Sequence, residues 1–325
     1  MRVAELRLAF WNVQNLFEPK VVPRGPQSEA ERDDKIGQLA DQISGFFDSN
    51  GPDVLGLAEV GSQPIFESIR AALNGTYLAL WEGPGQENQT GIGLLARSPT
   101  CTDLEHLAVD RPTITSRPRC LLARITLAGV DEPFLLAVNH WKSRLKSGGV
   151  DDAADRMESS RWLGDLLAAE DRTTAVVVIG DFNAEPFEAP FNELGIRGKR
   201  HFSSALWTGG TPAYLYNTAW RAMTEPALWE ETNVPDYEES RPKTSHDDSP
   251  GVIYDQLLVS GRVLKHGPIT LHERLIGYHH NDDIAYRTGN GVLRPQRWTY
   301  ANHATFAGAS DHFPLLATFR IRDSE

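Results

Sequence analysis

The stretch TTAVVVIGDFN (173–183) joins a strongly apolar run to two polar side chains at its end. The β-branched residues 176–179, bounded by threonine and glycine, are typical of a strand that is buried on both faces. Asp181 and Asn183 follow at once, as a carboxylate and an amide. A lone Asp or Asn after a strand is most often a turn residue that bonds its own backbone. Strand ends are also where α/β proteins build their sites, so this stretch indicates both an α/β fold and a candidate site.

Similar apolar runs recur along the chain and predict at least nine strands. They are Leu6–Trp11, Val54–Leu57, Thr76–Trp81, Ile92–Ala96, Cys120–Leu127, Phe134–Val138, Ala175–Ile179, Val252–Val259 and Leu315–Ile321. Several central runs follow one another with only turns between them, while the early and late ones alternate with helical patterns. This order predicts a mixed sheet rather than a purely parallel one.

Three segments have helical periodicity. The first, Ser28–Phe47, opens with a capping-box pattern at Ser28 and Glu31. Its predicted buried stripe is Ile36, Leu39, Ile43 and Phe47. The second segment is Gln63–Leu73. The third runs from about residue 151 to 169, and its predicted buried face consists of Met157, Leu163, Leu166 and Leu167.

Two long stretches, at about 196–250 and 277–305, are rich in Gly, Pro, Thr and charged residues and lack a sustained period. Loops of this length are usually functional or mobile. The tryptophans at 207, 220 and 229 are expected to pack their own loops onto the core; the alternative is a wedge that inserts into nucleic acid. A chain of 325 residues can bury a full core. We therefore expect a single domain over 1–325 that carries these two insertions.

Composition restricts the compartment and the kind of partner. Two cysteines, Cys101 and Cys120, make a disulfide framework improbable. The sequence contains neither a leader pattern nor about 18 uninterrupted apolar residues, so we expect a cytoplasmic protein that does not enter a membrane, and no obligate protein partner is evident. The net charge of −12 argues against broad adhesion to nucleic acid. A phosphate-bearing substrate remains compatible with it, because a basic cleft or a bound cation can reverse the field locally.

Polar residues gather where the predicted strands stop. They are Asn12, Asn15, Glu59, Asn139, His140, Asp181, Asn183, Asp255, Asp311 and His312. Each alone has an ordinary explanation as a turn, cap or strand-end residue, but their joint occurrence indicates a site. Asp255 lies in a run that otherwise reads as buried strand, where a carboxylate needs a partner, and His312 is the candidate. The carboxylates of Glu59 and Asp311 with the amide of Asn12 suit Mg²⁺ or Mn²⁺ rather than structural zinc.

Six motifs carry these polar residues along the chain. They are FWNVQNLF (10–17), LAEV (57–60), VNHWKSR (138–144), IGDFNAEP (179–186), YDQLLVS (254–260) and SDHFPLLATF (310–319). Together they resemble the endonuclease/exonuclease/phosphatase superfamily, whose fold is DNase I-like. The resemblance implies an α/β fold, a four-layer αββα sandwich of two packed mixed sheets flanked by helices. It also implies a metal-dependent phosphoesterase site at one rim.

The resemblance also assigns roles. The implied metal ligands are Glu59, Asn12 and Asp311. The implied catalytic residues are His140, Asp181, Asn183, Asp255 and His312: Asp255 and His312 resemble a dyad, Asp181 and Asn183 orient water and hold phosphate, and His140 contacts a phosphate oxygen. The expected substrate-binding residues are Asn15, Arg117, Lys142 and Arg144, with Arg119 placed like Arg117. For Lys142 and Arg144 the alternative is that they are solvated loop cations.

Gln14 departs from the pattern, since several DNA-cleaving relatives have an acidic residue there. A single Mg²⁺ or Mn²⁺ ion is therefore expected.

The leading hypothesis is a phosphodiester hydrolase, a DNA endonuclease or exonuclease that uses metal-assisted in-line attack of water and leaves 5′-phosphate and 3′-hydroxyl ends. The alternative enzyme is a phosphatase or phosphodiesterase for a small or lipid-linked phosphoester. A non-catalytic binding module is disfavoured because every position of the constellation is filled.

Overall fold

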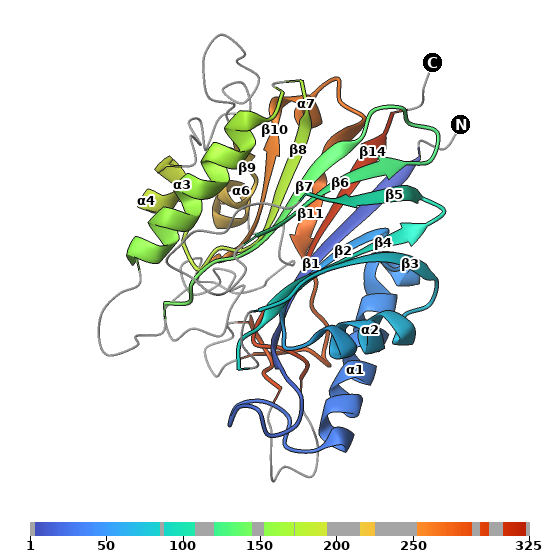
Figure 1. The fold of residues 1–325 in the computed structure, drawn as a ribbon, viewed down its shortest axis with the longest axis vertical. Coiled ribbons are helices and arrows are strands. Elements are labelled where there is room, and N and C mark those ends of the chain that lie inside the picture. Colours follow the sequence, from blue (N-terminus) through green and yellow to red (C-terminus); the bar gives the residue numbers. More distant parts are fainter. Residues whose placement is uncertain are drawn as a thin grey trace.

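Two β-sheets pack face to face between two outer layers of helices (Figure 1). The computed structural model describes residues 4–84, 88–107, 120–144, 153–171, 173–193, 215–224, 252–287, 293–298 and 308–322. This architecture confirms the predicted four-layer αββα sandwich of mixed sheets.

Each of the two large sheets has six strands within the described residues. The first has the order β11 (Ile269–Tyr278), β14 (Leu315–Ile321), β1 (Glu5–Leu16), β2 (Val54–Val60), β4 (Gly91–Ser98) and β3 (Thr76–Glu82). The second has the order β5 (Cys101–His106), β6 (Cys120–Leu127), β7 (Phe134–His140), β8 (Ala175–Asp181), β10 (Asp255–Ser260) and β9 (Leu215–Asn217). A small hairpin pairs β12 (Ala285–Arg287) with β13 (Leu293–Pro295).

The two large sheets share one pairing pattern. A parallel pair lies at the centre of each, β1 with β2 in the first and β7 with β8 in the second. Every other neighbouring pair in these sheets is antiparallel. Parallel neighbours need a crossover connection, and helices α1 (Glu29–Ser49) and α3 (Ala153–Ala169) lie in the two connections. The carboxyl ends of these four central strands therefore define one end of each sheet.

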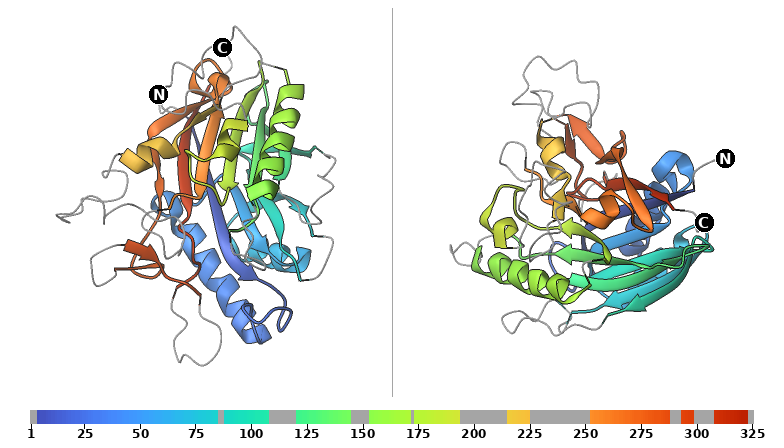
Figure 2. Two further views of the ribbon diagram at one scale, coloured as in Figure 1. Left: turned by 90° about the vertical axis from the view of Figure 1, so that its left-hand side faces the viewer. Right: turned by 90° about the horizontal axis from the view of Figure 1, so that it is seen from above.

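Helices cover the outer faces of both sheets (Figure 2). Helix α1 and helix α2 (Gln63–Ala72) pack on the first sheet, and α3 with the short α4 (Ala189–Glu193) pack on the second. Two further short helices, α6 (Ala219–Thr224) and α7 (Gly261–Leu264), contribute to the core between the sheets.

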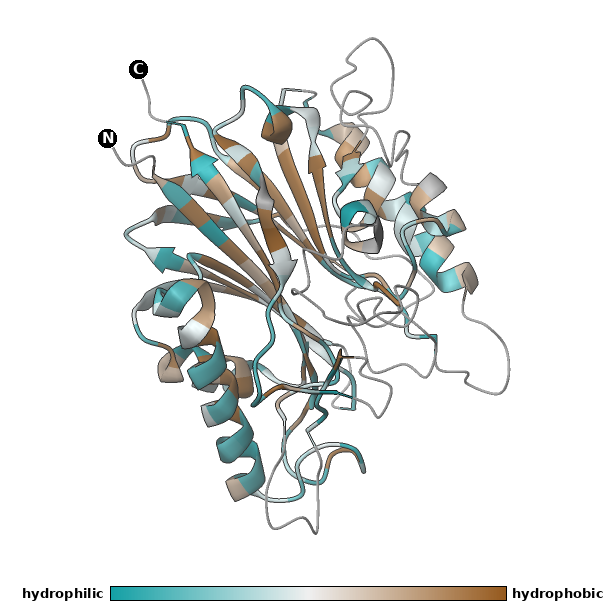
Figure 3. Cartoon of the chain, turned by 180° about the vertical axis from the view of Figure 1, so that it is seen from behind, coloured by the Kyte–Doolittle hydropathy of each residue, from teal (hydrophilic) through white to brown (hydrophobic). Residues whose placement is uncertain are grey.

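Strand periodicity divides the apolar side chains of β1 between two cores. Leu8 and Phe10 face the second sheet, whereas Ala9 and Trp11 face the helices. This alternation follows from the two-residue repeat of a strand. The central strands are apolar on both faces, and Figure 3 shows them as hydrophobic bands with hydrophilic helix surfaces outside.

The end of helix α1 differs from the predicted stripe. Ile36, Leu39 and Ile43 are buried as predicted, but Phe46 takes the last buried position instead of Phe47. The chain leaves helical geometry there, with φ of 54° at Phe47. The stripe therefore shifts by one residue at the end of the helix.

Helix α3 was predicted to bury an apolar face, and this prediction was largely wrong. Leu163 is buried, but the residues buried with it are Arg156, Ser159 and Ser160. They are tolerated because they bond to backbone carbonyls: Ser160 Oγ donates to the carbonyl oxygen of Pro190, and Arg156 donates to that of Lys142 at 3.3 Å.

Several elements had no clear periodic signal in the sequence. The strands β5, β9, β11, β12 and β13 were not predicted, and β10 begins at Asp255 rather than at Val252.

Cys101 and Cys120 are buried free thiols. Among the described helices, none has the length and apolar character needed to cross a bilayer.

Only parts of the two predicted loop insertions lie within the described residues. The first includes 215–224, which form β9 and α6, and the second includes 277–287 and 293–298, which form the end of β11 and the β12–β13 hairpin. Trp220 is half-buried on α6. Trp207 and Trp229 lie outside the described residues.

Candidate active site

The predicted site residues converge on one rim of the sandwich. Asn12, Glu59, His140 and Asp181 lie at or near the carboxyl ends of the four parallel central strands. Asp255 opens β10 and His312 precedes β14, and both strands run antiparallel to those neighbours. Their amino ends therefore reach the same rim. The topology brings together residues that are separated by up to 300 positions in the chain.

Asn12 joins the two sheets at this rim. Its Nδ2 donates to Glu59 Oε1 at 3.1 Å within the first sheet and to Asp181 Oδ2 at 3.0 Å in the second. His140 Nε2 lies 3.5 Å from Glu59 Oε1 and 3.9 Å from Asp181 Oδ2. Asn12 and His140 thus each contact both carboxylates, those of Glu59 and Asp181.

The backbone around these residues is locally strained. Gln14, Asn15 and Glu59 have positive φ values of 51°, 49° and 63°, and the register of β1 against β2 shifts between Asn12 and Leu16. This bulge directs the Asn15 amide N–H to Glu59 Oε2 at 2.7 Å and the Gln14 amide N–H to Asn12 Oδ1 at 3.0 Å. Left-handed non-glycine residues cluster at functional sites, where surrounding contacts hold them.

The GDFN turn combines a local turn bond with a carboxylate that faces the rim. The Asn183 amide N–H donates to Asp181 Oδ1 at 2.9 Å, which is a local turn bond, and Asn183 Nδ2 donates to the Trp141 carbonyl at 3.1 Å. The second oxygen of Asp181, Oδ2, faces Asn12, His140 and the loop before β14. The turn therefore fixes the orientation of the Asp181 carboxylate.

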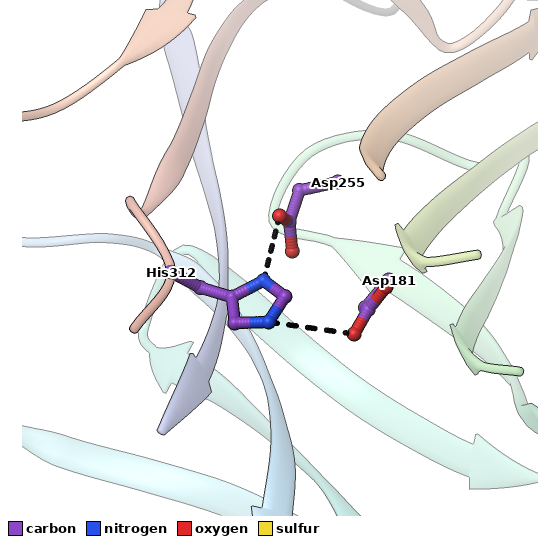
Figure 4. Close-up of side chains that lie close together, drawn as sticks. All are labelled: Asp181, Asp255 and His312. Carbon is purple, nitrogen blue, oxygen red and sulfur yellow. Dashed lines mark hydrogen bonds and ion pairs between the residues drawn. The ribbon is translucent and has the colours of Figure 1, made fainter. Parts of the chain in front are cut away.

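His312 lies between two buried carboxylates (Figure 4). Its Nδ1 bonds to Asp255 Oδ2 at 2.8 Å, and its Nε2 is 3.8 Å from Asp181 Oδ2. The loop that carries it is tied to β1, since Ser310 Oγ accepts from the His312 amide at 3.1 Å and donates to the Asn12 carbonyl at 2.6 Å. The Asp255–His312 contact has the geometry of an acid–imidazole dyad.

Burial and mutual charge set the protonation of this group. Burial raises the pKa of Asp181, and the charge of Asp255 adds to the rise, whereas His312 and His140 oppose it. Burial alone would lower the pKa of His312, but Asp255 and Asp181 together raise it well above its ordinary value. The two neighbouring carboxylates therefore favour the protonated form of His312.

The donor set at this rim fits a divalent cation. Glu59 and Asp311 are partly exposed, with side-chain exposures of 20% and 21%, and both attract the ammonium of Lys35. They are hard oxygen donors at the edge of a buried acidic group. Asp181, Asp255 and His312 also have atoms within 4.8 Å of one another. Within the described residues, this close group does not include the predicted ligands Glu59 and Asp311.

The remaining predicted residues lie around this group. Asn15 contributes its backbone to Glu59. Lys142 follows the His140 strand end and is half-buried. Arg144 lies next to the site, where it pairs with Glu188 at 2.8 Å and packs over the ring of Tyr254. Arg117 and Arg119 lie outside the described residues.

Lys35 and Trp298 both contact Gln14 beside the site, and neither was predicted from the sequence. Lys35 is fully buried on α1, and its Nζ donates to the Gln14 carbonyl at the strained turn. Lys35 precedes Leu39 by four positions and so lies on the apolar face of the helix. A lysine on that face was the signal from which its burial could have been predicted. Trp298 pairs with the side chain of Gln14 and has no comparable signal, since it lies in a stretch without periodicity.

Nearly the whole chain matches one protein family. Residues 9–312 match the Endonuclease/Exonuclease/phosphatase family. The chain belongs to this family. Members of the family are metal-dependent phosphoester hydrolases. No curated protein matches the chain at the sequence level.

Solved structures from the family share the fold at low sequence identity. A family protein from Bacteroides thetaiotaomicron has a TM-score of 0.58 at 14% identity, with 99% of this chain and 100% of that chain covered. D. rerio TDP2 complexed with a single-strand DNA product has a TM-score of 0.56 at 17% identity, with 97% and 99% covered. A mannosyl-6-phosphatase from B. thetaiotaomicron has a TM-score of 0.55 at 14% identity, with 97% and 99% covered. The chain is thus structurally similar to a DNA-bound protein and to a sugar phosphatase.

Proposed function

We propose that this protein is a divalent-metal-dependent phosphodiester hydrolase that acts on DNA as an endonuclease or exonuclease, and that residues 1–325 act as one domain. The observation that carries the proposal is the contact network in which Asn12 holds Glu59 and Asp181 while Asp255 holds His312. In this proposal Glu59 binds the cation, and Asp181 and His312 act on the water and the phosphate. Hydrolysis of a phosphoester requires these groups together.

Glu59, Asp311 and Asn12 would hold one Mg²⁺ or Mn²⁺ ion. When bound, the ion polarises a phosphate oxygen and offsets the charge that develops in the transition state. Gln14 uses both ends of its side-chain amide on the backbone of Trp298, which supports a single ion rather than two.

The chain's own residues supply the proton transfers and the orientation. Asp181 Oδ2 accepts a hydrogen bond from the attacking water and directs it to phosphorus. His312, kept as an imidazolium by Asp255, donates to a phosphate oxygen as negative charge grows there. His140 and Asn183 hold the remaining non-bridging oxygens, and Lys142 and Arg144 lie on the approach to them.

DNA is favoured as the substrate because the family includes a structural neighbour, TDP2, that is complexed with single-strand DNA product. Two observations favour a second candidate, a phosphatase for a small phosphoester. The net charge of −12 is unfavourable for binding a polyanion, and another neighbour is a mannosyl-6-phosphatase.

A substrate panel tests the proposal. Plasmid DNA, a single-stranded oligonucleotide, RNA and phosphorylated sugars would be incubated with the protein in Mg²⁺, in Mn²⁺ and in chelator. We expect cleavage of DNA in either metal and none in chelator. Asp181→Asn and Glu59→Gln are each expected to reduce the rate by about 100-fold or more.

A matched variant separates loss of the site from loss of charge. Glu67→Gln on α2 removes one carboxylate from a half-exposed pair with Arg70 and is expected to keep the wild-type rate. Cleavage by Asp181→Asn at the wild-type rate would contradict the site. Turnover of a sugar phosphate without any cleavage of DNA would select the second candidate.

A further inference from the structure

The segment Gln296–Trp298 is fastened to the active-site strand by Gln14. Gln14 Oε1 accepts from the Trp298 amide at 3.0 Å, and Gln14 Nε2 donates to the Trp298 carbonyl at 3.4 Å. One side chain thus bonds to both polar groups of a residue 284 positions away. Gln14 lies two residues after Asn12, so it ties the segment to the part of β1 that carries the proposed metal ligand Asn12.

Three further contacts hold the same segment. Lys35 donates to the Gln14 carbonyl and lies 5.7 Å from the centre of the Trp298 ring. The Gln296 amide donates to the Ile284 carbonyl at 2.8 Å. Gly308 packs so closely on the Gln296 carbonyl that a side chain there would collide with it. The segment is therefore fixed on both sides of Arg297.

Arg297 itself is placed at the edge of the site. Its side chain is 48% exposed, and its Nε lies 3.7 Å from Oδ2 of Asp311. Asp311 is one of the proposed metal ligands and precedes His312 in sequence. The guanidinium therefore lies next to a carboxylate that is proposed to bind the cation. At this distance and exposure the ion pair adds little to stability.

We propose that Arg297 is a substrate-binding residue that contacts a phosphate next to the scissile one, and that Gln14 is the positioning residue that holds it there. The proposal rests on the proposed function and deepens it by naming a residue that would distinguish a polynucleotide from a small monoester. The planar guanidinium group of arginine matches the geometry of a phosphate. When the metal binds one phosphate of a substrate, the exposed arginine beside the acidic rim can bind the next phosphate of the same chain. A small monoester has no second phosphate to offer.

The test compares two substrates in Mn²⁺: a single-stranded oligonucleotide and bis(p-nitrophenyl) phosphate. Arg297→Ala should reduce kcat/KM on the oligonucleotide by about tenfold, mainly through KM, because one charged hydrogen bond is lost. The loss should exceed the loss on the small diester by at least about fivefold. The slope of log KM against log salt should decrease by about 0.7, the value for one single-strand phosphate contact.

Gln14→Ala and the double variant test the positioning role. If Gln14 acts through Arg297, Gln14→Ala should cause the same selective loss, and the double variant should lose less than the product of the two single effects. Arg320→Ala, an exposed arginine on β14 away from the site, is the matched control and should match wild type on both substrates. Thermal unfolding of each variant checks that it is folded.

The outcomes separate the two proposals. Wild-type protein that cleaves neither substrate would overturn the proposed function and this inference with it. Wild-type activity on the small diester alone would overturn the polynucleotide assignment and leave a hydrolase. Wild-type activity on both, with Arg297→Ala equal to Arg320→Ala or with equal losses on the two substrates, would overturn only the role of Arg297.

Discussion

The proposed chemistry depends on the contact between Asp255 and His312. Asp255 has no exposed surface, and its Oδ2 bonds to His312 Nδ1 at 2.8 Å. The carboxylate fixes the orientation of the ring and favours its protonated form. An amide at this position would keep the shape of the side chain but remove the negative charge.

Asp255→Asn is therefore expected to lower kcat by about 100-fold or more, because the imidazolium is no longer stabilised. The affinity for Mn²⁺ should change far less, since Asp255 is not a proposed ligand. Steady-state kinetics with calorimetric titration of Mn²⁺ check both quantities, and Asp103→Asn on the exposed face of β5 serves as the control. A variant with wild-type kcat would rule out the dyad.

Lys35 is the second residue whose environment has a measurable consequence. Burial lowers its pKa to about 7, although the charges of Asp311 and Glu59 oppose this. The unfolded chain, with an ordinary lysine pKa near 10.5, binds the proton between pH 7 and that value while the folded chain does not. The free energy of unfolding should therefore rise with pH in this window.

Lys35→Met removes the titrating group and keeps the apolar stem. Between pH 7 and 9 the free energy of unfolding of wild type should gain up to about 2 kcal/mol relative to the variant. Urea unfolding in chelator at the two pH values measures the difference. Parallel pH profiles would mean that the ammonium is not buried as described.

At the scale of elements, the junction between β8 and its turn depends on a glycine. Gly180 has φ of 153° and lies opposite Asn139 in the parallel pair, where an added Cβ would collide with the Asn139 backbone. The absence of a side chain lets β7 and β8 stay paired up to His140 and Asp181. The two site residues are adjacent because Gly180 permits it.

Gly180→Ala is expected to destabilise the protein by about 2 kcal/mol or more, since the colliding atoms belong to backbone. Gly37 provides the matched comparison, because it lies exposed within helix α1 and an added Cβ there meets nothing within 4 Å. Gly37→Ala should stabilise by about 0.5–1 kcal/mol. Denaturant unfolding of both variants measures the contrast, and equal effects would contradict the described junction.

At the scale of the whole molecule, the sandwich concentrates negative charge at one rim of an already acidic chain. Glu59, Asp181, Asp255 and Asp311 gather there, and burial raises the pKa of Asp181. Part of the folding free energy is therefore spent on holding carboxylates together. A divalent cation offsets this repulsion and should bind only to the folded chain.

Mn²⁺ at about 100 times its Kd should stabilise the folded protein by about 2.7 kcal/mol. Thermal unfolding in Mn²⁺ and in chelator measures the shift in Tm. Glu59→Gln should lose most of the shift, whereas Glu67→Gln should keep it. A Tm that does not respond to Mn²⁺ would contradict a metal site in this group.

Much of the fold was predictable because it depends on local patterns. The nine predicted strands and the three helices are present, with shifts of a few residues at their ends. The errors have physical causes: the polar face of α3 is satisfied by backbone carbonyls, and strands such as β5 are too exposed to show a clear period. The motif residues Asn12, Glu59 and Asp181 were also found, because polar residues at the ends of apolar strands are visible in one sequence.

The sequence by itself determined the strands, the helices and the types of side chain at the strand ends, because strand and helix periodicity act over short distances, and the sandwich was expected from the family resemblance of the motifs. Only the tertiary structure decided which of these side chains meet. Asn12 reaches Asp181 across two sheets, and Gln14 and Lys35 reach Trp298 through contacts that depend on a strained turn and on burial. Such contacts link distant parts of the chain, and no local pattern specifies them.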